Sequence, residues 1–160
     1  EVLVVRVHPE LLAKQHLPSE GTGKSLWKRR FAQINAFEKY LTQNGIVVVK
    51  FFLNLSRQEQ KKRFLSRIDE PDKNWKFSVA DFQERAYWDE YQEAFDEALN
   101  HTSTKQAPWF VVPADNKWFG RLTVSEVLCH VLESLDLSYP KVDEPRRREL
   151  QAIKAELARE

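Results

Sequence analysis

Apolar residues recur every three to four positions in several stretches of the chain, and this spacing predicts amphipathic helices. Helix signals bound these stretches: Asn44-Gly45 is a stop, Pro71 closes the next helix, and Ser78 and Thr123 each begin a capping-box pattern. The predicted helices cover residues 26–44, about 57–69, about 78–99, 123–135 and about 145–159.

Two other stretches are continuous apolar runs, which are typical of strands covered on both faces of a parallel sheet. They are IVVVKFFL at residues 46–53 and the run from Pro108 to Pro113. The opening EVLVVRV also has the β-branched composition of a buried strand. Because strands and helices alternate, the sequence predicts an α/β fold with parallel strands. So small a sheet would leave apolar faces bare, and we expect a missing partner or a missing N-terminal half.

Composition is that of an ordinary globular chain. Its 160 residues, 42% of them hydrophobic, support one sizeable core or one domain with an appendage. A single cysteine excludes an internal disulfide framework, and the chain shows neither a signal peptide nor an apolar run long enough to span a membrane. We therefore expect a cytoplasmic protein that does not bind membranes.

Charge is segregated although the net charge is only +1. Acidic residues crowd positions 89–97, whereas basic residues cluster at 28–30, 61–67, 73–76 and 146–148. Local basic surface, rather than net charge, is therefore the clue to partners.

The stretch SEGTGKSLW, residues 19–27, contains the G-K-S of a phosphate-binding P-loop. A P-loop needs a glycine five positions before its G-K, and Pro18 stands there. The loop must also leave a strand and enter a helix, and no strand fits before it. We interpret the stretch as a flexible Gly/Ser linker, with Ser25 as the N-cap of the following helix.

The strongest candidate for a functional site lies within residues 56–78. On a helical wheel Arg63 and Arg67 fall on one arc, and the apolar residues of the same helix fall on another that can face a core. Guanidinium groups suit phosphate because their planar fork donates hydrogen bonds in pairs. Lys73 and Lys76 continue this positive surface. The alternative is a solvated face whose charges form ordinary surface ion pairs.

A second cluster directly follows the predicted strand at Pro108–Pro113. Asp115, Lys117 and Arg121 stand at that strand's carboxyl end, where open α/β sheets bind ligands. A plain strand-to-helix turn is the alternative, because Asp and Asn are common turn residues.

The sequence gives weaker support for other kinds of functional site. The four histidines show no zinc spacing, and Cys129 and His130 are adjacent on a predicted helix, where neighbouring side chains diverge, so no metal site is predicted. Aromatic residues interleaved with Lys and Arg fit stacking on single-stranded nucleic acid, but most fall on helical core stripes. Core packing is therefore the preferred interpretation, and nucleic acid is not an expected partner.

At the two basic clusters the sequence resembles the second polyphosphate kinase family, the polyphosphate:nucleotide phosphotransferases. The matching segments include, in order, EQKKRF, DKNWKFS, YWDEY, TSTKQAPW and ADNKWFGRL. The opening EVLVVRVHPELL resembles the branch that accepts both nucleoside mono- and diphosphates. The resemblance implies a partial P-loop kinase-like, three-layer α/β fold, whose parallel strands carry a mostly helical lid.

The resemblance implies phosphoryl transfer between inorganic polyphosphate and an adenine or guanine nucleotide such as ADP or AMP, with magnesium. The family's Walker A and Walker B motifs lie upstream of the matching region. We therefore expect a C-terminal portion that is inactive by itself, with Mg²⁺ held mainly by residues absent from these 160. The expected single domain, 1–160, comprises a lid module at about 56–99, a last strand and packing helix at 100–139, and a C-terminal helix at 140–160.

The resemblance also implies roles for the basic residues of the lid. Arg63 and Arg67 match the lid arginines, which are expected to be catalytic by neutralising the transferring phosphoryl group. Lys73 and Lys76 match the basic residues around the tryptophan of the family's WK signature and are expected to bind polyphosphate.

Roles outside the lid follow in the same way. Asp115, Lys117 and Arg121 match the motif after the last strand and are expected to be nucleotide-binding or structural. The opening segment enters a helix in the family, so EVLVVRV is expected to be helical despite its composition, with Arg6 pointing toward polyphosphate.

Two readings of a different class stay open. One is a noncatalytic polyanion-binding module for polyphosphate or RNA, favoured by the absent P-loop and the retained basic clusters. The other is a structural fragment that exposes a sheet edge and pairs with another copy of itself, which would make a homo-oligomer.

Overall fold

The structure is a computed structural model that describes residues 2–17 and 24–159. Its α-helices are α1 (Val4–Val7), α2 (Lys24–Gln43), α3 (Arg57–Asp69), α4 (Val79–Glu84), α5 (Trp88–Thr102), α6 (Lys117–Ser134) and α7 (Glu144–Leu157). Its strands are β1 (Lys50–Asn54) and β2 (Trp109–Pro113), and its 3-10 helices are η1 (Pro9–Lys14), η2 (Pro71–Lys76) and η3 (Arg85–Tyr87).

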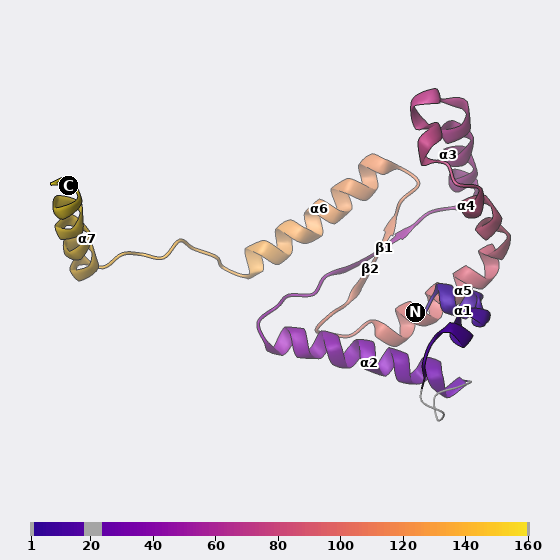
Figure 1. Cartoon of the computed structure of the whole chain (residues 1–160), viewed down its shortest axis with the longest axis horizontal. Coiled ribbons are helices and arrows are strands. Elements are labelled where there is room, and N and C mark those ends of the chain that lie inside the picture. Colours follow the sequence, from indigo (N-terminus) through magenta and orange to yellow (C-terminus); the bar gives the residue numbers. More distant parts are fainter. Residues whose placement is uncertain (1, 18–23, 160) are drawn as a thin grey trace. The chain divides into compact units, whose positions relative to one another are not determined.

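The sheet of the described residues consists of β1 and β2, which lie side by side and parallel (Figure 1). Lys50 is opposite Trp109, and Asn54 is opposite Pro113. Lys50 also fixes the start of β1, because its ammonium group donates to Glu38 of α2 at 2.7 Å and to the carbonyl of Thr102 at 2.6 Å. The predicted parallel α/β arrangement is confirmed.

The predicted strand at 46–53 is only partly formed. The ladder begins at Lys50, and residues 46–49 lie outside it. The reason is that β2 offers only five partner residues.

The opening segment is helical over Val4–Val7, so the strand expected from its composition is wrong and the helix implied by the resemblance is confirmed. Val5 is buried, and α1 packs on α5. Packing on a neighbouring helix therefore outweighs the β preference of valine.

The helix predictions differ in their outcome. The predicted helix at 57–69 is confirmed as α3, and the Ser56 hydroxyl caps it by accepting from the Glu59 N–H at 3.1 Å. The helix predicted over 78–99 is instead α4, η3 and α5, and Ser78 makes no side-chain cap bond. The cap predicted at Thr123 is wrong, because α6 starts at Lys117 and runs through it.

The linker predicted before α2 falls on residues 18–23, which lie outside the described part of the chain. Helix α2 begins at Lys24, so Ser25 lies within the helix and is not its N-cap.

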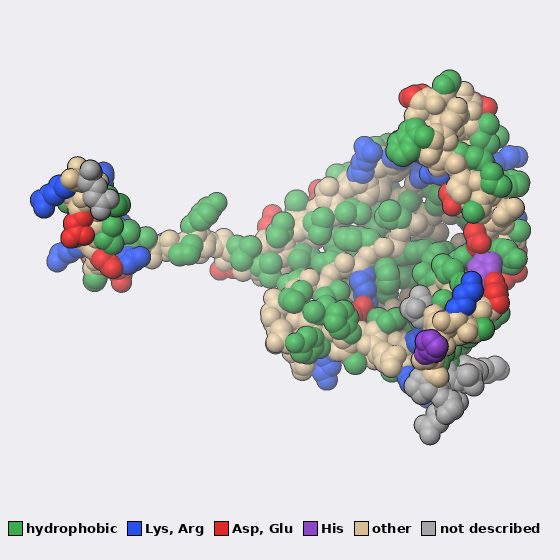
Figure 2. Space-filling view, viewed as in Figure 1, with side chains coloured by type: hydrophobic (Ala, Val, Ile, Leu, Met, Phe, Trp, Pro, Cys, Tyr) green, Lys and Arg blue, Asp and Glu red, His purple; other side chains and the backbone are tan. Residues whose placement is uncertain are grey.

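The chain divides into two compact units, residues 1–124 and 125–160, with the boundary inside α6. The single domain expected from the resemblance is not tested by this division and stays a prediction. The buried core of the first unit is small and includes Leu26, Phe31, Ala98 and Val112, of which Leu26 and Val112 are fully buried. Many large apolar side chains are exposed, and hydrophobic side chains gather over α2 (Figure 2).

Candidate phosphate-binding site

The carboxyl ends of the two strands are joined by hydrogen bonds from the loops that follow them. The Ala114 N–H donates to the Asn54 carbonyl at 2.9 Å. The Ser56 N–H donates to Asp115 Oδ1 at 2.7 Å. The start of α3 is thereby attached to the loop between β2 and α6, at the edge where open α/β sheets bind ligands.

Arg63 strengthens this attachment from about two turns further along α3. Its Nη2 donates to the carbonyls of Ala114 at 2.7 Å and Asp115 at 3.1 Å, and its Nε donates to Glu59 Oε1 at 2.9 Å. A guanidinium has five N–H donors, so these contacts use three of them. Nη1 makes no hydrogen bond to the described residues.

Asp115 takes part in the same attachment of α3. The hydrogen bond from the Ser56 backbone lowers the pKa of its carboxyl group, and the charge of Arg63 acts in the same direction. The side chain is therefore a carboxylate that accepts from Ser56. Its predicted role, nucleotide-binding or structural, stays a prediction.

Lys73 contacts the carboxylate of Glu70 at the turn between α3 and η2. Lys73 forms an ion pair with Glu70 and donates to Ser66 Oγ at 3.2 Å. The pKa of Glu70 is lowered by the hydrogen bond from Lys73, by that from Ser66, and also by the charges of Lys73 and Lys117. Lys117, from the second predicted cluster, thus acts on Glu70 through its charge. Figure 2 shows Lys and Arg side chains over α3 and at the start of α6.

The other predicted basic residues are held differently. The Arg67 guanidinium lies 5.7 Å from the ring centre of Phe64, and the Lys76 ammonium lies 4.9 Å from the ring centre of Trp75. Arg121 is exposed on α6.

Arg6 belongs to another cluster. It forms an ion pair with Glu97 of α5, and its guanidinium lies 5.4 Å from the ring centre of Trp27 in α2. These contacts hold α1 on its neighbours. Its predicted contact with polyphosphate stays a prediction.

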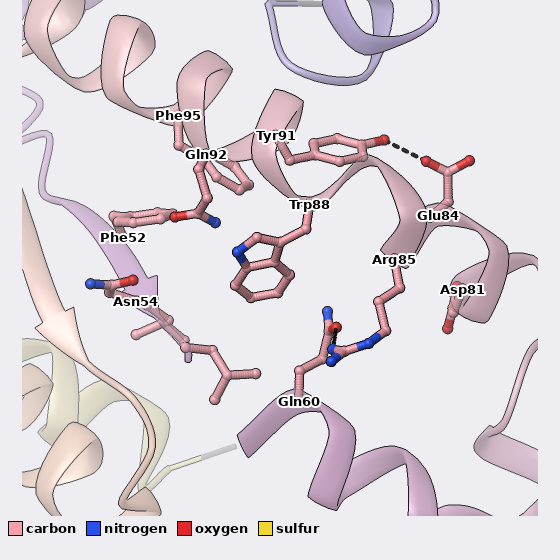
Figure 3. Close-up of a pocket in the computed structure, with 12 residues that line it drawn as sticks. Phe52, Asn54, Gln60, Asp81, Glu84, Arg85, Trp88, Tyr91, Gln92 and Phe95 are labelled. Carbon is pink, nitrogen blue, oxygen red and sulfur yellow. Dashed lines mark hydrogen bonds between the residues drawn. The ribbon is translucent and has the colours of Figure 1, made fainter. Parts of the chain in front are cut away.

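A hollow of about 230 Å³ opens between the end of β1, α3 and the α4–α5 segment (Figure 3). Arg85 extends into it and donates to Gln60 Oε1 at 2.5 Å, and the indole of Trp88 forms part of its wall. The sequence analysis did not single out Arg85 or Trp88 as site residues. Their spacing of three residues within the expected lid module was the signal available.

One wall of the hollow carries a titratable network. Glu84 accepts from the Tyr91 hydroxyl at 2.8 Å, and its Oε2 lies 2.9 Å from His8 Nε2. The hydrogen bond with Glu84 raises the pKa of His8, and the same bond, followed by that from Tyr91, lowers the pKa of Glu84. Burial raises the pKa of Tyr91 to about 12. The segment after α1 is thus joined to the α4–α5 junction.

Two features are absent from the described residues. No three or more His, Cys, Asp and Glu side chains in residues 2–17 and 24–159 are grouped so that they could hold a metal ion. Within the same ranges, no helix has both the length and the apolar character that crossing a membrane requires.

Comparison with known proteins identifies relatives of about twice this length. The chain is 51% identical to the ADP-polyphosphate phosphotransferase of Rhodopseudomonas palustris, over 98% of this chain and 55% of that protein. Polyphosphate kinase 2 from Arthrobacter aurescens, whose crystal structure is known, matches with a TM-score of 0.81 and 42% identity, over 94% of this chain and 50% of the other. The chain thus spans about half the length of these two proteins.

A shorter relative is also known. A protein of Leptolyngbya boryana described as "Uncharacterized protein in chlN 3'region" is 59% identical over 84% of this chain and 99% of its own length. The family described as "Polyphosphate kinase 2 (PPK2)" matches residues 21–140. This match includes both strands and the residues from Ser56 to Lys117 that surround the strand ends, and the chain therefore belongs to the polyphosphate kinase 2 family.

Proposed function

We propose that this chain supplies the phosphate-binding part of a polyphosphate:nucleotide phosphotransferase. The enzyme would move a phosphoryl group between inorganic polyphosphate and a nucleoside di- or monophosphate. The observation that carries the proposal is Arg63, which is fixed to the loop after β2 by two hydrogen bonds and to Glu59 of its own helix by a third, while its Nη1 has none among the described residues. Family membership and the name of the Rhodopseudomonas palustris relative support the choice of substrates.

The proposed role of Arg63 is to stabilise negative charge on the transferring phosphoryl group. In phosphoryl transfer the protein acts mostly by positioning the reactants and by stabilising charge on the phosphate oxygens. An arginine whose Nε and Nη2 are already held by the protein needs little reorganisation to present Nη1. Arg67, one turn further along α3, provides a second positive charge on the same helix.

Polyphosphate is a long polyanion and needs several positive groups in succession. Lys73 and Lys117 both act on Glu70, and Lys76 lies exposed at the end of η2. We propose that these three lysines hold the polyphosphate chain. Its binding should weaken steeply as salt is added, by analogy with the release of counterions from nucleic acid.

The resemblance also implies magnesium, which neutralises phosphate oxygens when it is bound. The described residues do not fit this role, because they present no cluster of metal ligands and Asp115 is engaged by Ser56. We therefore assign no step to a metal held by this chain. A lid movement of α3 and η2, and action in the cytoplasm, belong to the same proposal.

The test is ATP formation from polyphosphate and ADP, with a parallel reaction from AMP. The chain is measured alone and as a fusion to the part of the Rhodopseudomonas palustris enzyme that it does not match. We expect turnover in the fusion, and a loss of about 100- to 1,000-fold on Arg63→Ala, as for removal of one preorganised donor. Arg146→Ala, an exposed change on α7, is the matched control.

Turnover that survives Arg63→Ala within a few fold would contradict the role of Arg63. A fusion that binds polyphosphate regardless of nucleotide and forms no ATP would support the noncatalytic polyanion-binding module instead.

A further inference from the structure

Arg85, the first residue of η3, carries a half-buried positive charge that no carboxylate of the described residues neutralises. Its guanidinium donates to Oε1 of Gln60, a neutral amide, at 2.5 Å, and no ion pair within the described ranges includes it. Three other partly buried cations of the same unit do have a carboxylate partner, in the pairs Arg6–Glu97, Lys50–Glu38 and Arg63–Glu59. A guanidinium that has lost part of its hydration without gaining a counter-charge is stabilised by a bound anion.

The two carboxylates that line the same hollow do not supply this counter-charge. Glu84 accepts from the Tyr91 hydroxyl at 2.8 Å and lies 2.9 Å from His8 Nε2. Figure 3 shows Glu84 directed at Tyr91 and away from the Arg85 guanidinium, as expected for adjacent side chains of one helical segment. Asp81 is exposed and forms no ion pair with the described residues. The positive charge is therefore left to the hollow.

The hollow lies at the sheet edge that carries the proposed phosphate site. Its lining includes Asn54, the last residue of β1, and Leu55. Gln60 precedes Arg63 by three positions on α3, and residues with this spacing are neighbours on one helix face. Through Gln60, Arg85 thus reaches the helix that carries Arg63, at the edge where open α/β sheets bind ligands.

The rest of the lining suits a phosphate group. The indole of Trp88, whose ring centre lies 5.9 Å from the Arg85 guanidinium, forms an apolar part of the wall. Charge interactions are stronger beside such a wall than in open water. The side-chain amides of Asn54, Gln60 and Gln92 line the hollow as well, and each has N–H groups that can donate to phosphate oxygens.

We propose that Arg85 is a further phosphate-contacting residue, which donates to a phosphate group of the substrates inside the hollow of Figure 3. The inference rests on the proposed function, because that function supplies the phosphate. Gln60 directs the guanidinium without cancelling its charge. The phosphate group belongs to the nucleotide or to polyphosphate, which present the same chemistry to an arginine, and the kinetic arms of the experiment distinguish the two.

The first arm measures ATP formation by the fusion described above while ADP and polyphosphate are varied in turn. We expect Arg85→Ala to lower kcat/KM by about 10- to 100-fold, the usual range for loss of a hydrogen bond to a charged group. Arg85→Lys keeps the charge without the planar fork and should recover part of this loss. A rise in KM for ADP assigns the contact to the nucleotide, and a rise in KM for polyphosphate assigns it to that chain. Arg147→Ala, an exposed change on α7, is the matched control.

Gln60→Glu separates the charge of Arg85 from its support of the fold. The new side chain has nearly the same shape, and its carboxylate would pair with Arg85 and strengthen the link between α3 and η3. Because the guanidinium would then be neutralised, we expect kcat/KM to fall at least about tenfold. Gln60→Ala removes the partner but leaves the charge, and it should change kcat/KM by no more than a few fold. A purely structural role of Arg85 predicts the opposite order.

Binding provides a readout that needs no turnover. Tripolyphosphate and ADP are titrated calorimetrically into the free chain and into the fusion. We expect the parent to bind at least one of these anions about 10- to 100-fold more tightly than Arg85→Ala and Gln60→Glu do, and added salt should reduce the difference. An inactive fusion whose anion binding depends on Arg85 would overturn the proposed function alone.

Two results would overturn this inference and leave the proposed function standing. One is an active fusion whose kcat/KM survives both Arg85→Ala and Gln60→Glu within a few fold. The other is an active fusion in which Gln60→Ala is as harmful as Arg85→Ala while Gln60→Glu is not. Equal anion binding by the parent and Arg85→Ala would also contradict the contact. Since Gln60→Glu keeps the link between α3 and η3, its result stands even if Arg85→Ala does not fold.

Discussion

The two ends of the 46–54 segment are held in different ways. At its carboxyl end, Asn54 and Ser56 bond to the loop after β2, and Arg63 bonds to the same loop. At its amino end, residues 46–49 lie outside the ladder and expose apolar side chains. The chain therefore orders the edge that carries the proposed phosphate site by its own contacts, and residues 46–49 have no strand partner among the described residues.

The largest loss of stability is expected from a change in the buried side chain of a strand end. Val112 of β2 is fully buried. Val112→Ala leaves a cavity and should lower the free energy of unfolding by about 2 kcal/mol, because large-to-small core changes lose both transfer energy and packing. Urea titration monitored by circular dichroism measures it. A loss below the error of the titration would show that this end is not tightly packed.

The second largest effect is expected when the Asp115 carboxylate is removed, because the start of α3 should then open more often. Asp115→Ala deletes the acceptor of the Ser56 N–H, whereas Asp115→Asn keeps an oxygen at that position. We expect faster hydrogen exchange at Ser56 in the alanine variant and near-parent exchange in the asparagine variant. Equal exchange in both variants would mean that the hydrogen bond does not hold α3.

The Asp115 contact should also depend on pH. Its pKa is lowered in the folded chain, so its contribution is present above the ordinary carboxyl range and is lost as pH falls through the lowered value. The protection of Ser56 should therefore decrease in acid, and in Asp115→Asn it should depend less on pH.

The network beside the hollow offers a second pH test, of smaller effect. The pKa of His8 is raised from 6.5, so its stabilising contribution is fully present below that pH and is lost as pH rises through the raised value. The thermal midpoint of the parent should fall between about pH 6 and pH 8 more than that of His8→Gln. A parallel decline in both proteins would rule out this network as the cause.

The smallest effect should come from the free end of the strand. Val47→Ala is the same chemical change as Val112→Ala, but it falls on a side chain that is 49% exposed. The free chain should lose no more than about 0.5 kcal/mol of unfolding free energy, as is usual for surface positions. A loss similar to that of Val112→Ala would show that residues 46–49 are already held within this chain.

The candidate site was predictable only in its residue types. Arg63, Lys73, Asp115 and Lys117 could be selected because guanidinium, ammonium and strand-end carboxylate groups in that order suggest phosphate chemistry. The sequence did not indicate that Asp115 would accept from Ser56. That bond joins loops 59 positions apart, and no local pattern encodes such a contact.

The sequence by itself determined the elements whose signal is local. The bounds of α3 agree with the predicted 57–69, and β2 agrees with the apolar run before Pro113, because helical periodicity and proline act over a few residues. Only the tertiary structure decided that Val4–Val7 is a helix and that β1 starts at Lys50. The first depends on burial against α5 and the second on the length of a partner strand, and both come from residues distant in the sequence.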